Sequence, residues 1–425
     1  MSANTYYRVT AKRRSKDKAA VTVNTDKPDT HFSLESILAP LSVSEFFRDY
    51  YGKKFIHIQG EPGKFPDVMD FDSFARLLNM TSIWSAHSLE VVLDRARVDP
   101  RAYSVSAPNR DGQDVLKPDP DKVMDFLRQG ASLVANDVDA LTAGAAGIAN
   151  ALEQGLNVKT QGNLYYSWKQ RQAFASHFDT HDVFAVHLVG EKNWRIYENR
   201  VPSPIRHDAF SVSAEFQEKN RGPVAAEITM RPGDLLYLPR GQYHDALASS
   251  EGTIHIAFSA TGVIGLDFLA AMSDMVVGSE KYRLNFPRLE DGQDALKKHI
   301  EMLSAEFAKI ATSQDFLDRF TQFQRDFHYK RGGIQIPAVG KDPLYERLVH
   351  DAQVARFQNG FGLYRGNNVT PIPPGFEKPV AWMLSRRTFT LGEMAEAFPG
   401  ETPHSLNELL VQVRRMGLVD HAKKA

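Results

Sequence analysis

The sequence has no cysteine among its 425 residues. This absence excludes a disulfide scaffold, a zinc site with thiolate ligands and a cysteine nucleophile. A metal site in this chain therefore has to be built from nitrogen and oxygen ligands, which its 14 histidines and 52 acidic residues can supply.

Long apolar runs and an excess of charge of one sign are also missing. No stretch of about 18 consecutive apolar residues occurs, so no membrane-spanning helix is predicted. The N-terminus lacks the apolar segment of a signal peptide. The formal net charge of the chain is −1, which gives no indication of a broad nucleic-acid-binding surface. We therefore expect a cytoplasmic protein without membrane contact.

The composition that is present is globular, with 42% hydrophobic and 24% charged residues. The length predicts two to four domains. Residues 1–30 are polar and are interpreted as a solvated tail. The tail contains a basic cluster, for which a contact with nucleic acid or the ribosome is the alternative interpretation. The cluster consists of Lys12, Arg13, Arg14, Lys16 and Lys18.

Helical and extended patterns alternate over the first part of the chain. Ser33 and Ser42 precede apolar helical patterns and are expected to be the N-caps of two short helices. In chain order we expect helices within 33–51, a strand over 53–60, a helix from Asp72, strands over 89–98 and 102–107, a loop over 108–120, a helix over 121–130 closed by Gly130, and a helix ending near Gly155.

Residues 158–260 carry short apolar runs separated by Gly, Pro and Asn turns. This pattern predicts an antiparallel barrel or jelly roll. Helical spacing returns over 264–285 and 293–329. Residues 365–379 indicate a loop, and 380–420 indicate helices followed by a strand, as in a winged-helix module. The predicted fold class is therefore α+β.

Two runs within the strand-rich stretch carry metal-binding residue types. His177 and Asp179 stand at i and i+2, which puts both side chains on one face of an extended strand. His244 follows an apolar strand and a turn at 239–241, so a strand end delivers a second imidazole. Two histidines and one carboxylate are the ligand set of a non-heme Fe(II) site that leaves positions open for a co-substrate and O2. For the His-x-Asp motif alone, a pair of surface residues is the alternative.

Four further residues are candidates for a co-substrate pocket. Lys192 follows the turn at Gly190 and is placed to hold a distal carboxylate of 2-oxoglutarate by a charge-assisted hydrogen bond, unless it is a solvent-exposed hairpin lysine. Asn163 and Tyr165 lie one strand earlier and either face the same cavity or are ordinary polar strand residues. His255 either lines the site or is a satisfied core histidine. Weaker candidates are His181, His187 and His207, whereas Phe184 and Trp194 are expected in the core.

The motifs around these residues resemble those of the Jumonji-C ribosomal oxygenases, which are Fe(II)- and 2-oxoglutarate-dependent protein hydroxylases. The resemblance rests on GNLYYS (162–167), ASHFDTHDVFAVHLVGEKNWRIY (175–197) and GDLLYLPRGQYHDAL (233–247). It extends over about residues 33–420. The family pattern falls on Asn163 and Tyr165, His177 and Asp179, Asp182 and Phe184, Gly190, Lys192 and Trp194, and Gly233 through His244.

The resemblance implies a role for each of these candidates. His177, Asp179 and His244 would hold Fe(II), and Lys192 would hold the 2-oxoglutarate carboxylate. Asn163 resembles the family's polar residue next to the iron and the co-substrate. The implied partners are a protein or peptide substrate, in particular a ribosomal one, and a second copy of the chain in a homodimer.

The resemblance also implies an architecture. It consists of a cupin-like barrel (a double-stranded β-helix) with flanking helices, a helical dimerisation region and a C-terminal winged helix. The expected divisions are a polar tail over 1–30, the JmjC catalytic domain over 31–262, the helical region over 263–365 and the winged-helix-like domain over 366–425.

The chain departs from the family pattern near the pocket. His187 stands where the family usually has Gln, Ile256 where it often has Thr or Ser, and residues 167–176 (SWKQRQAFAS) replace the usual proline-rich loop. These differences leave the three predicted iron ligands intact. They leave open the substrate, the hydroxylated residue and the regiochemistry.

Three functions are therefore compatible with the sequence. The first is a protein or peptide hydroxylase of the ribosomal-oxygenase type. The second is a tailoring oxygenase for a small molecule or a ribosomally made peptide. The third is a non-enzymatic cupin-like protein that binds a partner. An intact metal triad argues against the third, and the motif set with the winged-helix end favours hydroxylation over histone demethylation.

Overall fold

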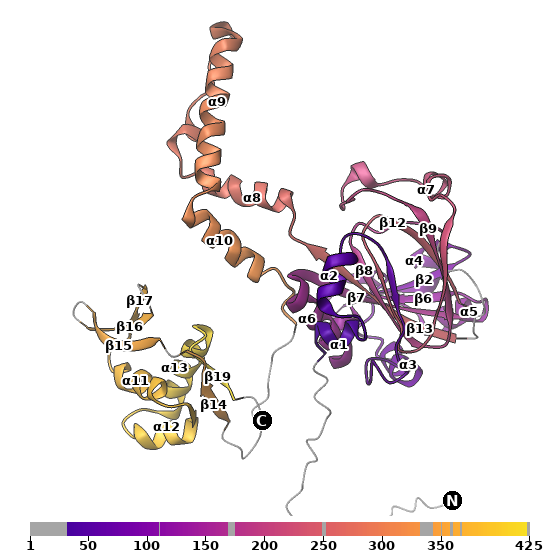
Figure 1. The fold of residues 1–425 in the computed structure, drawn as a ribbon. Helices are drawn as coiled ribbons and strands as arrows, with labels where there is room; N and C mark the ends of the chain where they lie inside the picture. Colours follow the sequence, from indigo (N-terminus) through magenta and orange to yellow (C-terminus); the bar gives the residue numbers. More distant parts are fainter. Residues whose placement is uncertain are drawn as a thin grey trace, which may run out of the picture. The chain divides into compact units, whose positions relative to one another are not determined.

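The computed structural model describes residues 32–109, 111–168, 175–248, 252–331, 343–349, 351–357, 360–365 and 368–422. They belong to two compact units, Met1–Arg331 and Gly332–Ala425 (Figure 1). The polar tail and its basic cluster lie outside the described residues.

Two antiparallel sheets form the barrel of the first unit. The larger has the strand order β1-β11-β8-β13-β7-β6-β2-β3, and the smaller has the order β10-β9-β12. Apolar side chains from β8 and β11 pack against those of β9 and β10, so the two sheets face each other as in a cupin-like barrel. The strands are β1 (Ile56–Ile58), β2 (Leu89–Leu93), β3 (Ala96–Arg97), β6 (Ser132–Ala135), β7 (Val158–Trp168), β8 (Asp182–Val189), β9 (Lys192–Arg200), β10 (Val224–Met230), β11 (Leu235–Leu238), β12 (Gln242–Ala248) and β13 (Gly252–Gly262).

Helices cover the outer face of the larger sheet. On β7, Val158 and Leu164 join the main core together with Ile148 and Leu152 of a helix, whereas the odd-numbered Asn163 points to the other face. The predicted N-caps are confirmed, because the side chains of Ser33 and Ser42 each accept a hydrogen bond from the backbone N–H of the residue three positions later. The helices are α1 (Leu34–Leu38), α2 (Val43–Asp49), α3 (Phe71–Leu78) and α6 (Ala143–Leu156).

Two stretches differ from the sequence prediction. The expected loop over 108–120 is wrong at Asp114–Pro118, because this segment pairs as β5 with β4 (Ser104–Pro108). The expected run of strands over 158–260 is interrupted by α7 (Ala214–Asn220), which Ser213 caps. The remaining short elements are α4 (Pro100–Tyr103), α5 (Pro120–Arg128), η1 (Val138–Ala140) and η2 (Asp208–Phe210).

The helices expected over 264–285 and 293–329 are present. They are α8 (Gly265–Val276), η3 (Glu280–Arg283), η4 (Leu289–Asp291), α9 (Gly292–Ala311) and α10 (Gln314–Arg325). The helical pattern does not continue to residue 365, because strands begin again at Leu344 in the second unit.

A buried ion cluster ties the end of the helical region to the barrel. The guanidinium of Arg331 lies 2.6 Å from a carboxylate oxygen of Asp139 and 2.6 Å from one of Glu153, and all three side chains are at most 7% exposed. The same carboxylates accept hydrogen bonds from β7, Asp139 from Gly162 N at 2.7 Å and Glu153 from Thr160 N at 3.0 Å. Arg331 therefore neutralises two carboxylates that hold the backbone of β7.

The second unit has its own core, built around Met383, Phe389 and Leu410. A three-stranded sheet of order β18-β14-β19 packs with three helices, and a separate antiparallel sheet of order β15-β16-β17 precedes them. The loop expected over 365–379 is wrong where β17 pairs with β16. The elements are β14 (Leu344–Arg347), β15 (Ala352–Phe357), β16 (Gly360–Arg365), β17 (Asn368–Ile372), α11 (Glu377–Ser385), β18 (Thr388–Thr390), α12 (Leu391–Ala397), α13 (Pro403–Arg415) and β19 (Val419–His421). Across the described residues, none of the helices has the length and apolarity that a membrane crossing requires.

Candidate metal centre

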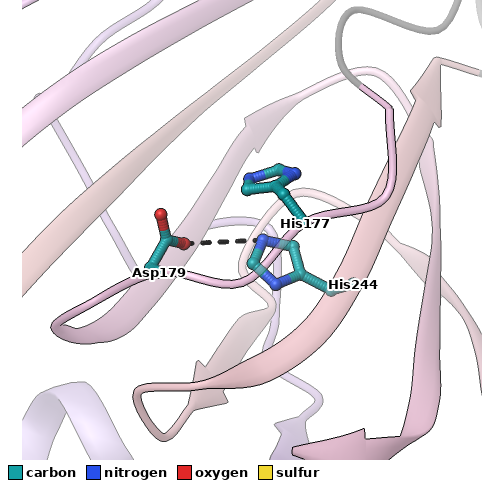
Figure 2. A group of neighbouring side chains, drawn as sticks. All are labelled: His177, Asp179 and His244. Atoms are coloured by element: carbon teal, nitrogen blue, oxygen red, sulfur yellow. Dashed lines mark ion pairs between the residues drawn. The ribbon is translucent and has the colours of Figure 1, made fainter. Parts of the chain in front are cut away.

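Three predicted ligands converge between the two sheets. His177, in the segment before β8, forms an isolated antiparallel bridge with His244 of β12. Their backbones exchange hydrogen bonds of 3.0 and 2.8 Å, and Asp179 O accepts a third bond from Gly241 N at 2.8 Å. As Figure 2 shows, the side chains of His177, Asp179 and His244 lie together, with one ligand atom of each within 4.8 Å of the others.

The two imidazoles are oriented alike, with Nε2 directed towards the place where the three ligand atoms converge. The Nδ1 atom of His177 lies 2.9 Å from the carbonyl oxygen of Ala175, and that of His244 lies 3.0 Å from the carbonyl oxygen of Gln242. Because a carbonyl only accepts, each Nδ1 carries the proton, and each Nε2 is the ring nitrogen whose lone pair can bind a metal. Backbone hydrogen bonds of this kind orient metal-binding histidines.

The protonation states also suit metal binding. Burial and the neighbouring His177 lower the pKa of His244 to about 4, so its imidazole is neutral at pH 7. Burial by itself would raise the pKa of Asp179, but the charges of His181, His177 and His244 outweigh it and leave that pKa below its usual value. At neutral pH the site therefore offers the neutral imidazole of His244 and the ionised carboxylate of Asp179, which are the ligand forms that a divalent metal requires.

The turn before β12 depends on a glycine. Gly241 has φ +84°, a backbone conformation that residues with a Cβ seldom adopt, and a Cβ there would overlap the carbonyl oxygen of Val201. The buried carboxylate of Asp182 supports the same turn, because it accepts hydrogen bonds from Arg240 N at 2.8 Å and from the Tyr237 hydroxyl at 2.7 Å. The conformation of this turn therefore directs the His244 side chain into the space between the two sheets.

The triad lines a cavity of about 230 Å³. The side chains come from both sheets, so the cavity lies between them. Every residue predicted for the co-substrate pocket also lines this cavity: Asn163, Tyr165, Lys192 and His255.

Lys192 is buried, with 2% of its surface exposed, so the exposed-hairpin alternative is wrong. Its Nζ lies 3.3 Å from Ser167 Oγ and 3.5 Å from His255 Nδ1. No carboxylate of the described residues forms an ion pair with this ammonium, and burial lowers the pKa of Lys192 to about 7. An anion entering the cavity would therefore find a buried cation without a counter-charge.

The other predicted pocket residues surround this lysine. The rings of Tyr165 and His255 stack with centroids 4.8 Å apart. Burial, followed by the charges of Lys192 and His187, holds the pKa of His255 well below its usual value. Asn163 Oδ1 accepts a hydrogen bond from Asp137 N at 3.2 Å, which turns its amide NH2 away from that backbone.

Comparison with known proteins matches residues 142–264 to the JmjC domain family. The chain therefore contains a JmjC domain. Two curated relatives are both named bifunctional lysine-specific demethylase and histidyl-hydroxylase NO66. The protein from Drosophila erecta is 24% identical over 262 residues, 59% of this chain and 37% of the relative. The protein from Culex quinquefasciatus is 27% identical over 363 residues, 81% of this chain and 52% of the relative.

The chain spans about half or less of the length of these two relatives. Among solved structures, the ribosomal oxygenase YcfD from Escherichia coli in complex with cobalt and 2-oxoglutarate is 16% identical. The match covers 90% of this chain and 99% of that chain, with a TM-score of 0.49.

The Jumonji-C cavity contains residues that sequence reasoning placed elsewhere or missed. Trp194, expected in the core, is buried but also lines the cavity and stacks on His244 with ring centroids 5.7 Å apart. His181, named as a weaker candidate, lines the cavity two residues after Asp179. Ser259 was missed, although it lies on β13 four residues after His255, so strand alternation would have found it. Arg97 comes from β3, and no local pattern indicated it.

The remaining histidine candidates do not reach the cavity. His187 is fully buried, and its Nε2 lies 2.9 Å from Gly190 O, whereas its Nδ1 has no hydrogen-bond partner among the described residues. His207 instead caps η2 by accepting a hydrogen bond from Ala209 N. Phe184 is a core residue, as expected.

Proposed function

We propose that this chain is an Fe(II)- and 2-oxoglutarate-dependent oxygenase that hydroxylates a side chain of a protein or peptide. The observation that carries the proposal is the common orientation of His177 and His244. Both rings are held through Nδ1 by backbone carbonyls and offer Nε2 next to the Asp179 carboxylate. Two imidazoles and one carboxylate fit Fe(II) and leave coordination positions for 2-oxoglutarate and O2.

The residues have separate roles in this proposal. His177, Asp179 and His244 hold the metal, which supplies the oxidising chemistry when it is bound with 2-oxoglutarate and O2. Lys192 holds the distal carboxylate of 2-oxoglutarate, because it is the buried cation without a counter-charge in the cavity. Asn163, Tyr165 and His255 shape the wall around both groups.

A polypeptide substrate is favoured by the relatives. Their names describe a histidyl-hydroxylase, a lysine-specific demethylase and a ribosomal oxygenase, and we take a ribosomal protein as the first candidate. A tailoring oxygenase for a small molecule or a ribosomally made peptide is the second candidate. It stays open because the chain departs from the family pattern at His187 and Ile256, although neither residue lines the metal cavity.

The finer features of the assembly are also proposals. The described helices α8 to α10 carry apolar side chains that are largely exposed, among them Leu269 at 51% and Ile300 at 48%, and we propose that a second copy of the chain covers them in a homodimer. The helices α11 to α13 with the sheet β18-β14-β19 support a winged-helix-like domain. A cytoplasmic location stays a prediction from the sequence.

Turnover of 2-oxoglutarate by the purified chain with Fe(II) tests the enzyme. Extracted ribosomes and a panel of metabolites are then compared as co-substrates, with mass spectrometry for a gain of about 16 Da, the mass of one oxygen atom. Succinate formation coupled to a modified ribosomal protein is the expected result. Coupling to a metabolite alone would favour the tailoring enzyme, and no turnover at all would favour the binding protein.

A further inference from the structure

A second cavity, of about 220 Å³, adjoins the metal cavity, and His181 lines both. It lies where the segment after Asp179 meets the turn before β12. That junction is fixed by two hydrogen bonds of 2.8 Å, from Gly241 N to Asp179 O and from Arg240 N to Asp182 Oδ1. The second cavity is therefore built by the same two segments that carry the metal-binding residues.

The charge of this second cavity is positive. Arg200 and Arg240 both line it, and neither guanidinium has a carboxylate partner among the described residues. Arg200 is held by backbone carbonyls, including that of Gly52 at 3.0 Å, whereas the Arg240 side chain makes no hydrogen bond within the described part of the chain. The acidic residue in the lining, Asp182, is buried and already accepts hydrogen bonds from Tyr237 and Arg240 N.

Hydroxyl groups complete the lining. Tyr51, Thr180 and Thr261 all line the cavity, and their hydroxyls have no hydrogen-bond partner within the described residues. Burial and the Asp182 carboxylate raise the pKa of Tyr51 to about 12, so its phenol is a neutral donor at pH 7. A free guanidinium surrounded by hydroxyl donors is suited to a carboxylate, which only accepts hydrogen bonds.

We propose that this second cavity binds the carboxylate of an Asp or Glu residue of the polypeptide substrate, close in sequence to the residue that enters the metal cavity. Consecutive residues of an extended chain are about 3.3–3.6 Å apart. A polypeptide with one side chain at the metal therefore brings its neighbouring residues close to His181, which lines both cavities. The proposal rests on the proposed function, because it presumes a polypeptide substrate.

Direct binding of matched peptides to the full chain tests the proposal. The probes are short blocked peptides with a central histidine among glycines, carrying Asp or Asn at one position on either side. Their dissociation constants are measured by ligand-observed NMR. At one flanking position we expect the Asp peptide to bind about tenfold more tightly than its Asn match, as a charge-assisted hydrogen bond in a half-open cavity allows.

Substitutions of Arg240 test whether the preference for the Asp peptide arises in the second cavity. Arg240→Gln removes the guanidinium but keeps the backbone N–H that holds Asp182, and it should equalise the Asp and Asn peptides. Arg240→Glu should reverse the preference towards a Lys peptide. Arg231→Gln is the matched control, because Arg231 is an exposed arginine paired with Glu191 outside this cavity, and it should keep the Asp preference.

Equal affinities of the Asp and Asn peptides in the unchanged protein, no binding of any peptide, or an Asp preference that survives Arg240→Gln would each overturn the assignment. The proposed function is judged separately, by turnover of 2-oxoglutarate with Fe(II). Turnover without an Asp preference removes only the carboxylate site. An Asp preference without turnover would contradict the proposed oxygenase function but would leave the carboxylate-binding site supported.

Discussion

At the scale of single residues, the metal centre depends on which imidazole nitrogen carries the proton. Each histidine donates through Nδ1 to a backbone carbonyl two residues before it, Ala175 for His177 and Gln242 for His244. The protein therefore selects the tautomer by local backbone geometry, before any metal is present. Burial keeps the His244 imidazole neutral down to about pH 4. This arrangement lowers the cost of organising the ligands when a metal enters.

His177→Ala or His244→Ala should each abolish turnover and weaken Fe(II) binding by at least about tenfold, since one of three ligands is lost. Metal titration by calorimetry under anaerobic conditions measures the binding. His87→Ala is the control, because this histidine is exposed and outside the cavity. Full activity in either triad variant would contradict the metal assignment.

The buried Lys192 makes the use of 2-oxoglutarate dependent on pH. Its pKa is about 7 in the free protein, and only the protonated amine attracts a carboxylate. Above pH 7 the protonated fraction falls about tenfold per pH unit, so kcat/KM for 2-oxoglutarate should fall in proportion between pH 7 and 9. Steady-state rates across this range measure the slope.

Two variants test whether Lys192 causes the pH dependence of kcat/KM for 2-oxoglutarate. Lys192→Arg stays charged over the whole range and should flatten the slope, and Lys192→Ala should raise the 2-oxoglutarate requirement steeply at every pH. Lys297→Ala, at a side chain that is 76% exposed, is the control. An unchanged requirement in Lys192→Ala would remove this residue from the anchor role.

At the scale of elements, the turn between β11 and β12 sets the position of His244. Gly241→Ala would force a Cβ into a left-handed backbone conformation and against the Val201 carbonyl. We expect a loss of about 1–3 kcal/mol in the free energy of unfolding and weaker Fe(II) binding. Chemical denaturation and metal titration measure the two effects. Gly265→Ala, with open space around its Cβ position, should change neither.

The Arg331 ion cluster is the second feature that stabilises the arrangement of the elements. Arg331→Ala would leave the buried carboxylates of Asp139 and Glu153 without their cation. Breaking a buried pair in this way costs about 3–5 kcal/mol, which denaturant unfolding can measure. Arg319→Ala breaks an exposed pair with Asp315 on α10 and should cost well under about 1 kcal/mol. Equal losses in the two variants would show that burial does not strengthen the cluster.

At the scale of the whole molecule, we propose that a second copy of the chain covers the exposed apolar side chains of α8 to α10. Leu296 and Ile300 lie one turn apart on α9 and are 41% and 48% exposed. If these helices form the dimer interface, dilution should not readily yield a folded monomer. Light scattering coupled to size exclusion measures the mass, and a stable monomer of the unchanged chain would contradict the proposal.

A matched pair of variants tests the α9 surface itself. Leu296→Glu combined with Ile300→Glu should convert the dimer to a monomer or an unfolded chain, because charges would be buried in an apolar interface. Lys298→Glu places a charge of the same sign on the opposite face of the helix and should leave the mass unchanged.

The sequence determined the features that depend on local spacing. The i, i+2 spacing of His177 and Asp179 put two ligands on one face, and the Gly241 turn aimed His244. Alternation on β7 and β13 put Asn163, Tyr165 and His255 on the cavity face. Family motifs over the same stretch led to the Jumonji-C identification, which the domain match confirms.

The tertiary structure decided what depends on which faces meet. Pairing with β4 turned the expected loop at Asp114–Pro118 into a strand, and packing between the sheets made Lys192 a buried cation and Trp194 part of the cavity wall. Arg97 and the cavity around Arg240 arise from segments far apart in the sequence. Local spacing sets only the direction of a side chain, whereas burial and charge environment depend on long-range contacts, which is why these features needed the folded structure.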